Sequence, residues 1–156
     1  IAATCDRPIG AVLKQELYDI PFIHQIALCT NSFPMNREDV RQSLTVIQHV
    51  TQEVKDGRGY LIFPEGTRSK KGNEMLDFHG GSFRCATKSG CPVVPIALVD
   101  CFKVLDQPGS KPVSVQAHYL KPITAQEYAG MKPAELAALV KQRIQEKLDE
   151  CLKAEE

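Results

Sequence analysis

An acid, a glycine, a hydroxyl group and a guanidinium follow one another in the stretch YLIFPEGTRSKKG, residues 60–72. Glu65 can accept hydrogen bonds, and Gly66 permits a tight turn and the close approach of a ligand to the backbone. Thr67 adds a hydroxyl, and Arg68 presents a planar fork of donors that suits phosphate or carboxylate. The stretch therefore predicts a polar, anion-binding site. A turn closed by a Glu65–Arg68 ion pair, without any ligand, explains the same residues.

The elements that would position this site follow an α/β pattern. Apolar runs typical of strands occur at residues 9–13, 60–63, 91–102 and 112–120. Helices are predicted for residues 39–55, for residues 80–90 and from Pro133 onward. This alternation, with several strands apolar throughout, predicts a mostly parallel mixed sheet covered by helices. Ligands bind beyond the carboxyl ends of strands in such sheets, and residues 65–68 follow the end of one strand.

The two longer helices are predicted from their periodicity. The apolar face of the first consists of Val40, Leu44, Ile47, Val50 and Val54. The face of the second consists of Leu136, Val140, Ile144, Leu148 and Leu152. Both sets recur at helical spacing. Residues 18–29 are interpreted as a loop and a short helix, residues 32–39 as a proline-containing turn, and residues 124–127 as a capping box.

Length and composition restrict the class of protein. The 156 residues suit one domain, and 19 basic residues balance 19 acidic ones. This balance argues against a nucleic-acid-binding protein held by bulk positive charge. The six cysteines form no C-x-x-C pair, so no metal site is predicted. Three disulfides are conceivable, but we favour reduced, buried thiols because a chain of this length needs no covalent staples.

The letters of the motif suggest a family. The stretch FPEGTRS, residues 63–69, resembles a signature of the glycerophospholipid acyltransferases, specifically the 1-acylglycerol-3-phosphate (lysophosphatidate) acyltransferases. Three further stretches resemble family blocks in the family's order: VLKQELYDIP at 12–21, FPMNR at 33–37 and VVPIAL at 93–98. The resemblance covers about residues 1–125 and implies a single acyltransferase domain over residues 1–156.

The resemblance implies a reaction and a set of binding residues. An acyl group would move from a thioester, on coenzyme A or acyl carrier protein, to the free hydroxyl of lysophosphatidate, giving phosphatidate. No cofactor or metal is implied. Arg37 and the loop Glu65, Gly66, Thr67 and Arg68 would hold the glycerol phosphate, since two guanidinium groups can share a dianion. Pro95 would shape its strand near the acyl chain or the pocket wall.

The family's catalytic motif, His-x-x-x-x-Asp, does not occur in this sequence. Five residues after the four histidines, at positions 24, 49, 79 and 118, stand Cys29, Val54, Arg84 and Ile123. In the family the histidine is the general base and the aspartate orients it. The chain also begins with Ile1 rather than methionine. We therefore expect an excerpt, truncated at its N-terminus and inactive by itself, with the motif upstream of Ile1. A homologue that lost the pair but still binds phospholipid is the alternative.

The acceptor implied by the resemblance resides in a bilayer, so we expect a membrane-associated protein on the cytoplasmic face. No apolar run in the sequence reaches the length of a membrane span. The candidate contact surfaces are residues 20–28, IPFIHQIAL, and the pair Lys70 and Lys71. Core packing is the slightly favoured interpretation of residues 20–28. Another glycerolipid acceptor, such as glycerol 3-phosphate, is compatible with the same arginines.

Overall fold

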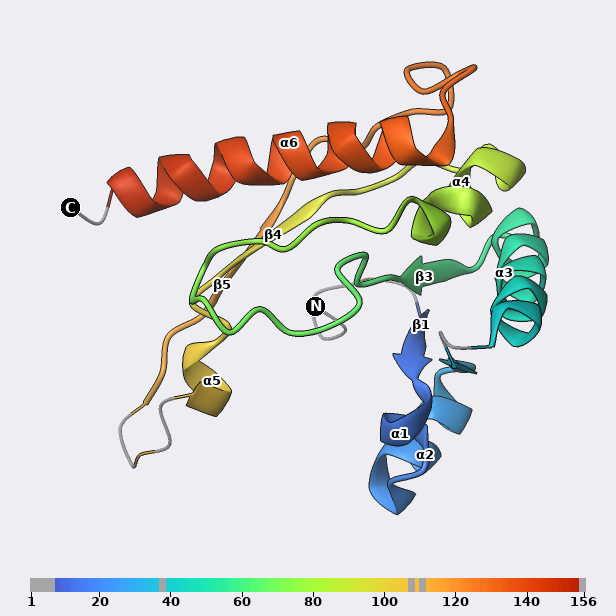
Figure 1. Ribbon diagram of the computed structural model, residues 1–156, viewed down its shortest axis with the longest axis horizontal. Helices are drawn as coiled ribbons and strands as arrows, with labels where there is room; N and C mark the ends of the chain where they lie inside the picture. Colours follow the sequence, from blue (N-terminus) through green and yellow to red (C-terminus); the bar gives the residue numbers. More distant parts are fainter. Residues whose placement is uncertain (1–7, 37–38, 107–108, 110–111, 155–156) are drawn as a thin grey trace. The chain divides into compact units, whose positions relative to one another are not determined.

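The computed structural model describes residues 8–36, 39–106, 109 and 112–154 (Figure 1). The chain divides into two compact units, Ile1–Phe63 with Arg84–Cys91, and Pro64–Phe83 with Pro92–Glu156. The first unit contains a parallel sheet and the second an antiparallel pair of strands, each with its own helices. The α/β class with parallel strands and helices is therefore confirmed.

The strand predicted at residues 9–13 is confirmed as β1, Ile9–Lys14, and it is the central strand of the parallel sheet of the first unit. β2, Phe33–Met35, pairs with one side of β1, and β3, Gly59–Leu61, with the other. The carboxyl ends of all three strands therefore face the same edge of the sheet. Two short helices, α1 (Gln15–Tyr18) and α2 (Pro21–Cys29), follow β1 and lie beyond that edge (Figure 1).

The prediction of a turn at residues 32–39 is wrong for its first part, because Phe33–Met35 is strand β2. Pro34 lacks the N–H that a central strand needs, but β2 lies at the edge of the sheet, where proline is tolerated. Asn31 ends the preceding helix with a φ of 52°, and the hydroxyl of Ser32 accepts a hydrogen bond from the backbone N–H of Ala11 at 2.9 Å. Contacts distant in sequence thus define this strand.

The predicted helix at residues 39–55 is confirmed as α3, Val40–Lys55. The carboxylate of Asp39 caps it by accepting from the backbone N–H groups of Arg41 and Gln42, and Gly57 follows its end with a φ of 92°. The predicted apolar face is only partly correct. Val40 and Leu44 are exposed, whereas Val46, Val50 and Thr51 are buried.

The buried face of α3 is set by its neighbours in the first unit. α3 packs against β2, β3 and α4, Arg84–Ser89. Val46 and Val50 form one buried cluster with Cys85, whose thiol has its pKa raised to about 11 by burial and by the nearby Cys91 thiol. None of the five described cysteines is in a disulfide bond. Cys29 is exposed, however, which corrects the expectation that the thiols are buried.

The interpretation of residues 20–28 as core is also wrong. In α2 only Ala27 is buried and Ile23 is partly exposed. The other large apolar side chains of the segment are exposed, namely Ile20, Phe22, Ile26 and Leu28. No helix in the described part of the chain is both long enough and apolar enough to cross a membrane.

Two predicted buried strands are shorter than expected. β3 ends at Leu61, and Phe63 is half exposed, so residues 60–63 are not a fully buried strand. In the second unit, β4 comprises only Ile96–Val99 of the predicted segment 91–102. Pro95, which has no N–H, precedes β4, and Asp100 ends it with a φ of 62°. Beyond Pro95 the pairing continues only as an isolated bridge from Val93 to Ile123.

β4 pairs antiparallel with β5, Gln116–Tyr119, the core of the predicted strand at residues 112–120. In the sequence, Val113, Val115, Ala117 and Tyr119 alternate with other residues, which predicts a half-buried strand near an edge. Val113, Val115 and Tyr119 are exposed, while Gln116 and His118 are the less exposed pair. The apolar positions of this segment therefore do not contribute the buried face that the sequence indicated.

The last helix, α6, is Pro133–Lys153 and begins at the predicted proline. Leu136, Val140, Ile144 and Leu148 are buried as predicted, and Leu152 at the end is exposed. α6 packs on β4 and on the short 3₁₀ helix η2, Gly80–Phe83 (Figure 1). The predicted capping box is formed, since Oε2 of Glu127 accepts from the backbone N–H of Thr124 at 2.8 Å, but it closes a turn rather than starting a helix.

Candidate functional site

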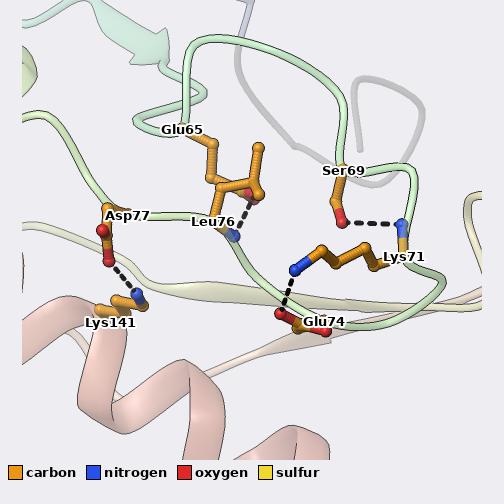
Figure 2. Close-up of polar contacts among 7 residues, drawn as sticks. All are labelled: Glu65, Ser69, Lys71, Glu74, Leu76, Asp77 and Lys141. Carbon is orange, nitrogen blue, oxygen red and sulfur yellow. Dashed lines mark hydrogen bonds and ion pairs between the residues drawn. The ribbon is translucent and has the colours of Figure 1, made fainter.

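The motif that the sequence singles out lies in a closed loop of the second unit. The backbone N–H of His79 donates to the carbonyl of Pro64 at 2.9 Å and joins the two ends of the loop. Inside the loop, Oε2 of Glu65 accepts from the backbone N–H of Leu76 at 2.8 Å (Figure 2). A charged acceptor on a backbone donor is one of the stronger hydrogen bonds in proteins. Glu65 therefore holds the loop together.

Gly66 allows the turn that follows. Its φ is 78°, a left-handed conformation that side chains disfavour. Thr67 and Arg68, immediately after it, are both exposed. The glycine thus turns the chain outward and leaves the hydroxyl and the guanidinium accessible to a ligand in solution.

Arg68 forms an ion pair with Asp106, at the end of the short helix α5, Lys103–Asp106. Nη1 of Arg68 lies 3.0 Å from Oδ1 of Asp106, and 46% of the arginine side chain is exposed. Among the described residues no ion pair joins Glu65 to Arg68, so the predicted turn closed by that pair is not formed. The Asp106 carboxylate thus orients the guanidinium, and a bound anion would compete with it for the donors of Arg68.

The outer part of the loop is fixed by polar contacts between three pairs of residues. The hydroxyl of Ser69 accepts from the backbone N–H of Lys71 at 3.2 Å, and the ammonium of Lys71 lies 3.2 Å from Oε1 of Glu74 (Figure 2). Asn73 pairs with Asp100: its amide donates to the carboxylate at 3.1 Å, and its carbonyl oxygen accepts from the backbone N–H of Asp100 at 2.8 Å. The loop is therefore tied to the turn that follows β4.

The electrostatic surroundings of the loop are mixed in sign. The ammonium of Lys103 and the amide of Asn73 lower the pKa of the Asp100 carboxyl, so Asp100 remains ionised and neutralises Lys103. At the other end, Lys141 of α6 lies 2.8 Å from Asp77 and lowers the pKa of that carboxyl (Figure 2). Most of the charge around the loop is thus internally paired.

The remaining predicted residues lie apart from this loop or outside the described residues. Pro95 is fully buried, and its carbonyl accepts from the backbone N–H of Leu120 at 3.0 Å. It thus shapes the start of β4, while its contact with an acyl chain stays a prediction. Arg37 lies outside the described residues. His79 contributes its backbone to the loop, and its side chain is exposed.

The other three histidines contact protein groups, and Nε2 of His118 also lies 3.5 Å from the Sγ atom of Cys151 in α6. Nδ1 of His24 lies 3.3 Å from the carbonyl oxygen of Tyr18, and Nε2 of His118 lies 2.9 Å from Oε1 of Gln116. His49 stacks on Phe33 with the ring centres 6.0 Å apart. Contacts of this kind are typical of histidines with a structural role.

Sequence reasoning missed Asp106 and Asn73. Asp106 is the partner of Arg68, and Asn73 holds the loop against Asp100. Asp106 lies in a different segment of the chain from the motif, so no local spacing rule could have found it. An asparagine one residue after a glycine is itself a common turn signal, but nothing in the sequence indicates its partner.

Comparison with known proteins identifies relatives of the chain. Residues 1–99 match the family model described as Acyltransferase. The chain is 35% identical over 94 residues to "1-acyl-sn-glycerol-3-phosphate acyltransferase BAT2, chloroplastic" of Brassica napus, which covers 60% of this chain and 27% of that protein. It is 28% identical over 144 residues to the 1-acyl-sn-glycerol-3-phosphate acyltransferase of Salmonella typhimurium, which covers 92% of this chain and 58% of that protein.

A solved structure shows the same fold. The crystal structure of the 1-acyl-sn-glycerophosphate acyltransferase PlsC from Thermotoga maritima superposes with a TM-score of 0.72 at 24% identity. The match covers 93% of this chain and 57% of that one. The chain therefore spans only part of the length of each of these relatives.

Proposed function

The chain belongs to the Acyltransferase family, and from this we propose that its protein acylates 1-acylglycerol 3-phosphate to give phosphatidate. The observation that supports this function best is the exposed guanidinium of Arg68, presented after the Gly66 turn on a loop that Glu65 holds closed. A planar fork of donors at an accessible turn suits the phosphate of such an acceptor.

In the proposed reaction the free hydroxyl of the acceptor attacks the carbonyl carbon of an acyl thioester. A carbon–oxygen bond forms, the carbon–sulfur bond breaks, and the thiol of coenzyme A or acyl carrier protein leaves. The hydroxyl proton passes to a general base, for which the family motif supplies a histidine oriented by an aspartate. No metal or further cofactor takes part in the proposal.

Arg68 and Arg37 are assigned to the acceptor phosphate in this proposal, with Thr67 as an additional donor. Two guanidinium groups neutralise a dianion better than one. Glu65 acts as a positioning residue because its carboxylate is already used by the backbone of Leu76. Since acceptor and product are lipids, we also propose that the protein works at a membrane surface, on its cytoplasmic face.

The proposal is tested with Arg68→Ala in a longer form of the protein that contains a His-x-x-x-x-Asp motif. The apparent KM for the phosphate-bearing acceptor should rise about 10- to 100-fold, as expected for the loss of a charged hydrogen bond of about 1.5–3 kcal/mol. The KM for the thioester should stay unchanged. Arg143→Ala is the matched control, because Arg143 also forms an ion pair at 3.0 Å, with Glu127. A lower Tm with unchanged acceptor kinetics would instead assign Arg68 to structure alone.

We further propose that residues 1–156 alone do not catalyse the transfer, because none of the four histidines has an aspartate five residues later. A base and its orienting group are worth several orders of magnitude in rate. Turnover by this chain at the rate of the longer form would contradict the proposal. The second candidate function is a non-catalytic phospholipid-binding module. Binding of lysophosphatidate by the longer form without any turnover would favour this second candidate.

A further inference from the structure

The outward side of α2 is apolar and has no covering element in the described part of the chain. Three large apolar residues of the helix have high exposed fractions, Phe22 72%, Ile26 47% and Leu28 61%, and Ile20, directly before the helix, is 44% exposed. Ile23 is only partly exposed. Phe22 and Ile26 are separated by one helical turn and share one face, while Ala27 points inward and is buried. Leu28, two residues after Ile26, lies farther around the helix. We call Ile20, Phe22, Ile26 and Leu28 together the α2 apolar face.

No formal charge interrupts this surface. The segment from Ile20 to Asn36 contains no aspartate, glutamate, lysine or arginine. Apart from the α2 apolar face, the exposed residues of the helix are Pro21, Gln25 and Cys29. A surface helix in water normally carries charged residues on its outer side, as α6 does with Glu146 and Asp149. The composition of α2 is therefore typical of a helix that is buried away from water on its outer side as well.

α2 lies beyond the carboxyl edge of the parallel sheet in the first unit (Figure 1). α1 begins directly after Lys14 at that edge, and β2 ends at the same edge. The α2 apolar face is therefore part of the surface of the first unit where the three parallel strands end.

We propose that the α2 apolar face inserts into the interfacial layer of a lipid bilayer, the source of the acceptor lipid; this inference rests on the proposed function. A helix of nine residues is only about 14 Å long, too short to span a bilayer, so it lies in the plane of the interface. Specific protein interfaces have a polar rim with hydrogen bonds. On its outward side α2 has few polar groups besides the amide of Gln25 that could form such a rim. Lipid acyl chains, which need no hydrogen bonds, are therefore the ligand that suits this surface.

The chain contains no tryptophan, which permits a direct test. Phe22→Trp in the 156-residue chain introduces a single fluorescent reporter into the α2 apolar face. With phosphatidylcholine vesicles its emission should shift to the blue, and lipids brominated along the acyl chain should quench it. Val115→Trp is the control, placed at an exposed apolar residue of the second unit. Equal responses at both positions, or none at residue 22, overturn the proposal.

Charge insertion gives the second measurement. Ile26→Asp should weaken sedimentation with the same vesicles at least tenfold, whereas Val115→Asp should not; the two side chains are 47% and 46% exposed in the parent chain. Both sites are exposed, so the far-UV circular dichroism and Tm should stay close to those of the parent. If Ile26→Asp instead converts a dimer to a monomer in light scattering while vesicle binding persists, the face is a self-association surface and the proposal is wrong.

Acyl-transfer assays with soluble and with vesicle-embedded acceptors distinguish failure of the bilayer contact from failure of the proposed function. In the longer form, Ile26→Asp should retain acyl transfer to a water-soluble, short-chain lysophosphatidate and lose at least tenfold in rate with the acceptor embedded in vesicles. Loss on both acceptors contradicts the bilayer contact. If no variant or parent acylates either acceptor while Phe22→Trp still reports insertion, the proposed function fails and the bilayer contact stands.

Discussion

The guanidinium of Arg68 lies 3.0 Å from the carboxylate of Asp106, and the carboxylate of Glu65 is instead bound to the backbone N–H of Leu76. Glu65 and Arg68, two residues of one short motif, therefore have different roles. Glu65 closes its own loop, and Arg68 is oriented by a residue of another segment while half of its side chain remains exposed.

Asp106→Asn should strengthen acceptor binding. The aspartate competes with a bound phosphate for the guanidinium, and an exposed ion pair of this kind is worth about 0.2–1 kcal/mol. The apparent KM for the acceptor should fall about 1.5- to 5-fold in steady-state assays of the longer form. Glu127→Gln, which changes the partner of Arg143, is the matched control. A raised KM would show that Asp106 holds Arg68 in its productive orientation.

Glu65→Ala should loosen the loop. The backbone N–H of Leu76 loses its acceptor, and we expect about 1 kcal/mol of destabilisation together with faster hydrogen exchange at the Leu76 amide. Glu65→Gln keeps an acceptor oxygen and should recover much of the protection. Glu74→Ala, which removes only the exposed pair with Lys71, is the control and should change little. Unchanged hydrogen exchange at the Leu76 amide would contradict the role of Glu65 in closing the loop.

Arg37 and Arg68 should be coupled in acceptor binding. Arg37 lies outside the described residues, so its part in the phosphate site stays a prediction. Arg37→Ala and Arg68→Ala should each weaken binding, and the double variant should differ from their sum by about 0.5–3 kcal/mol. Arg37→Lys should not restore full activity, since an ammonium lacks the planar two-point contact. Additive effects in the double-mutant cycle would separate the two arginines into independent roles.

Tyr60 should make stability fall at alkaline pH. Its hydroxyl donates to the carbonyl of Asn31 or to Glu53, at 3.1 and 3.0 Å, and burial with the adjacent Glu53 carboxylate raises its pKa to about 12. The folded state therefore prefers the neutral phenol. This stabilisation is complete below the unfolded-state pKa of about 10 and is lost as pH rises through about 12.

Urea unfolding at a series of alkaline pH values checks the Tyr60 prediction. In Tyr60→Phe the free energy of unfolding should depend less on pH in this range. In Glu53→Gln the pH range over which stability falls should be narrower, because this change removes one cause of the raised pKa of Tyr60. If the free energy of unfolding of Tyr60→Phe declines with pH as steeply as that of the parent chain, other groups cause the decline.

Gly10→Ala should destabilise the first unit. A Cβ at this position of β1 would lie 2.6 Å from Cε1 of Tyr60 and 3.1 Å from the backbone oxygen of Asn31. Relief requires the tyrosine ring to move, so we expect a loss of about 1–3 kcal/mol in the free energy of unfolding. Gly81→Ala is the control, because a Cβ there would meet no atom within 4 Å. Equal stability of both variants would show that the Tyr60 ring yields at little cost.

The amino-acid sequence was sufficient for the elements whose signals are local. The Asp39 cap and Gly57 mark the ends of α3, and Pro133 with its apolar stripe defines α6. The FPEGTRS motif was sufficient to indicate the family. These features depend on hydrogen bonds and periodicities within a few residues, which are visible in any short window of the chain.

Only the tertiary structure decided the features that depend on partners far along the chain. Pro34 lies in a strand because β2 has a free edge, and Arg68 pairs with Asp106 because the loop and α5 come together in the second unit. The exposure of Phe22 was equally invisible, since a short apolar run has the same letters whether a neighbouring element covers it or not. Burial and long-range pairing belong to the packed chain, and a local pattern specifies neither.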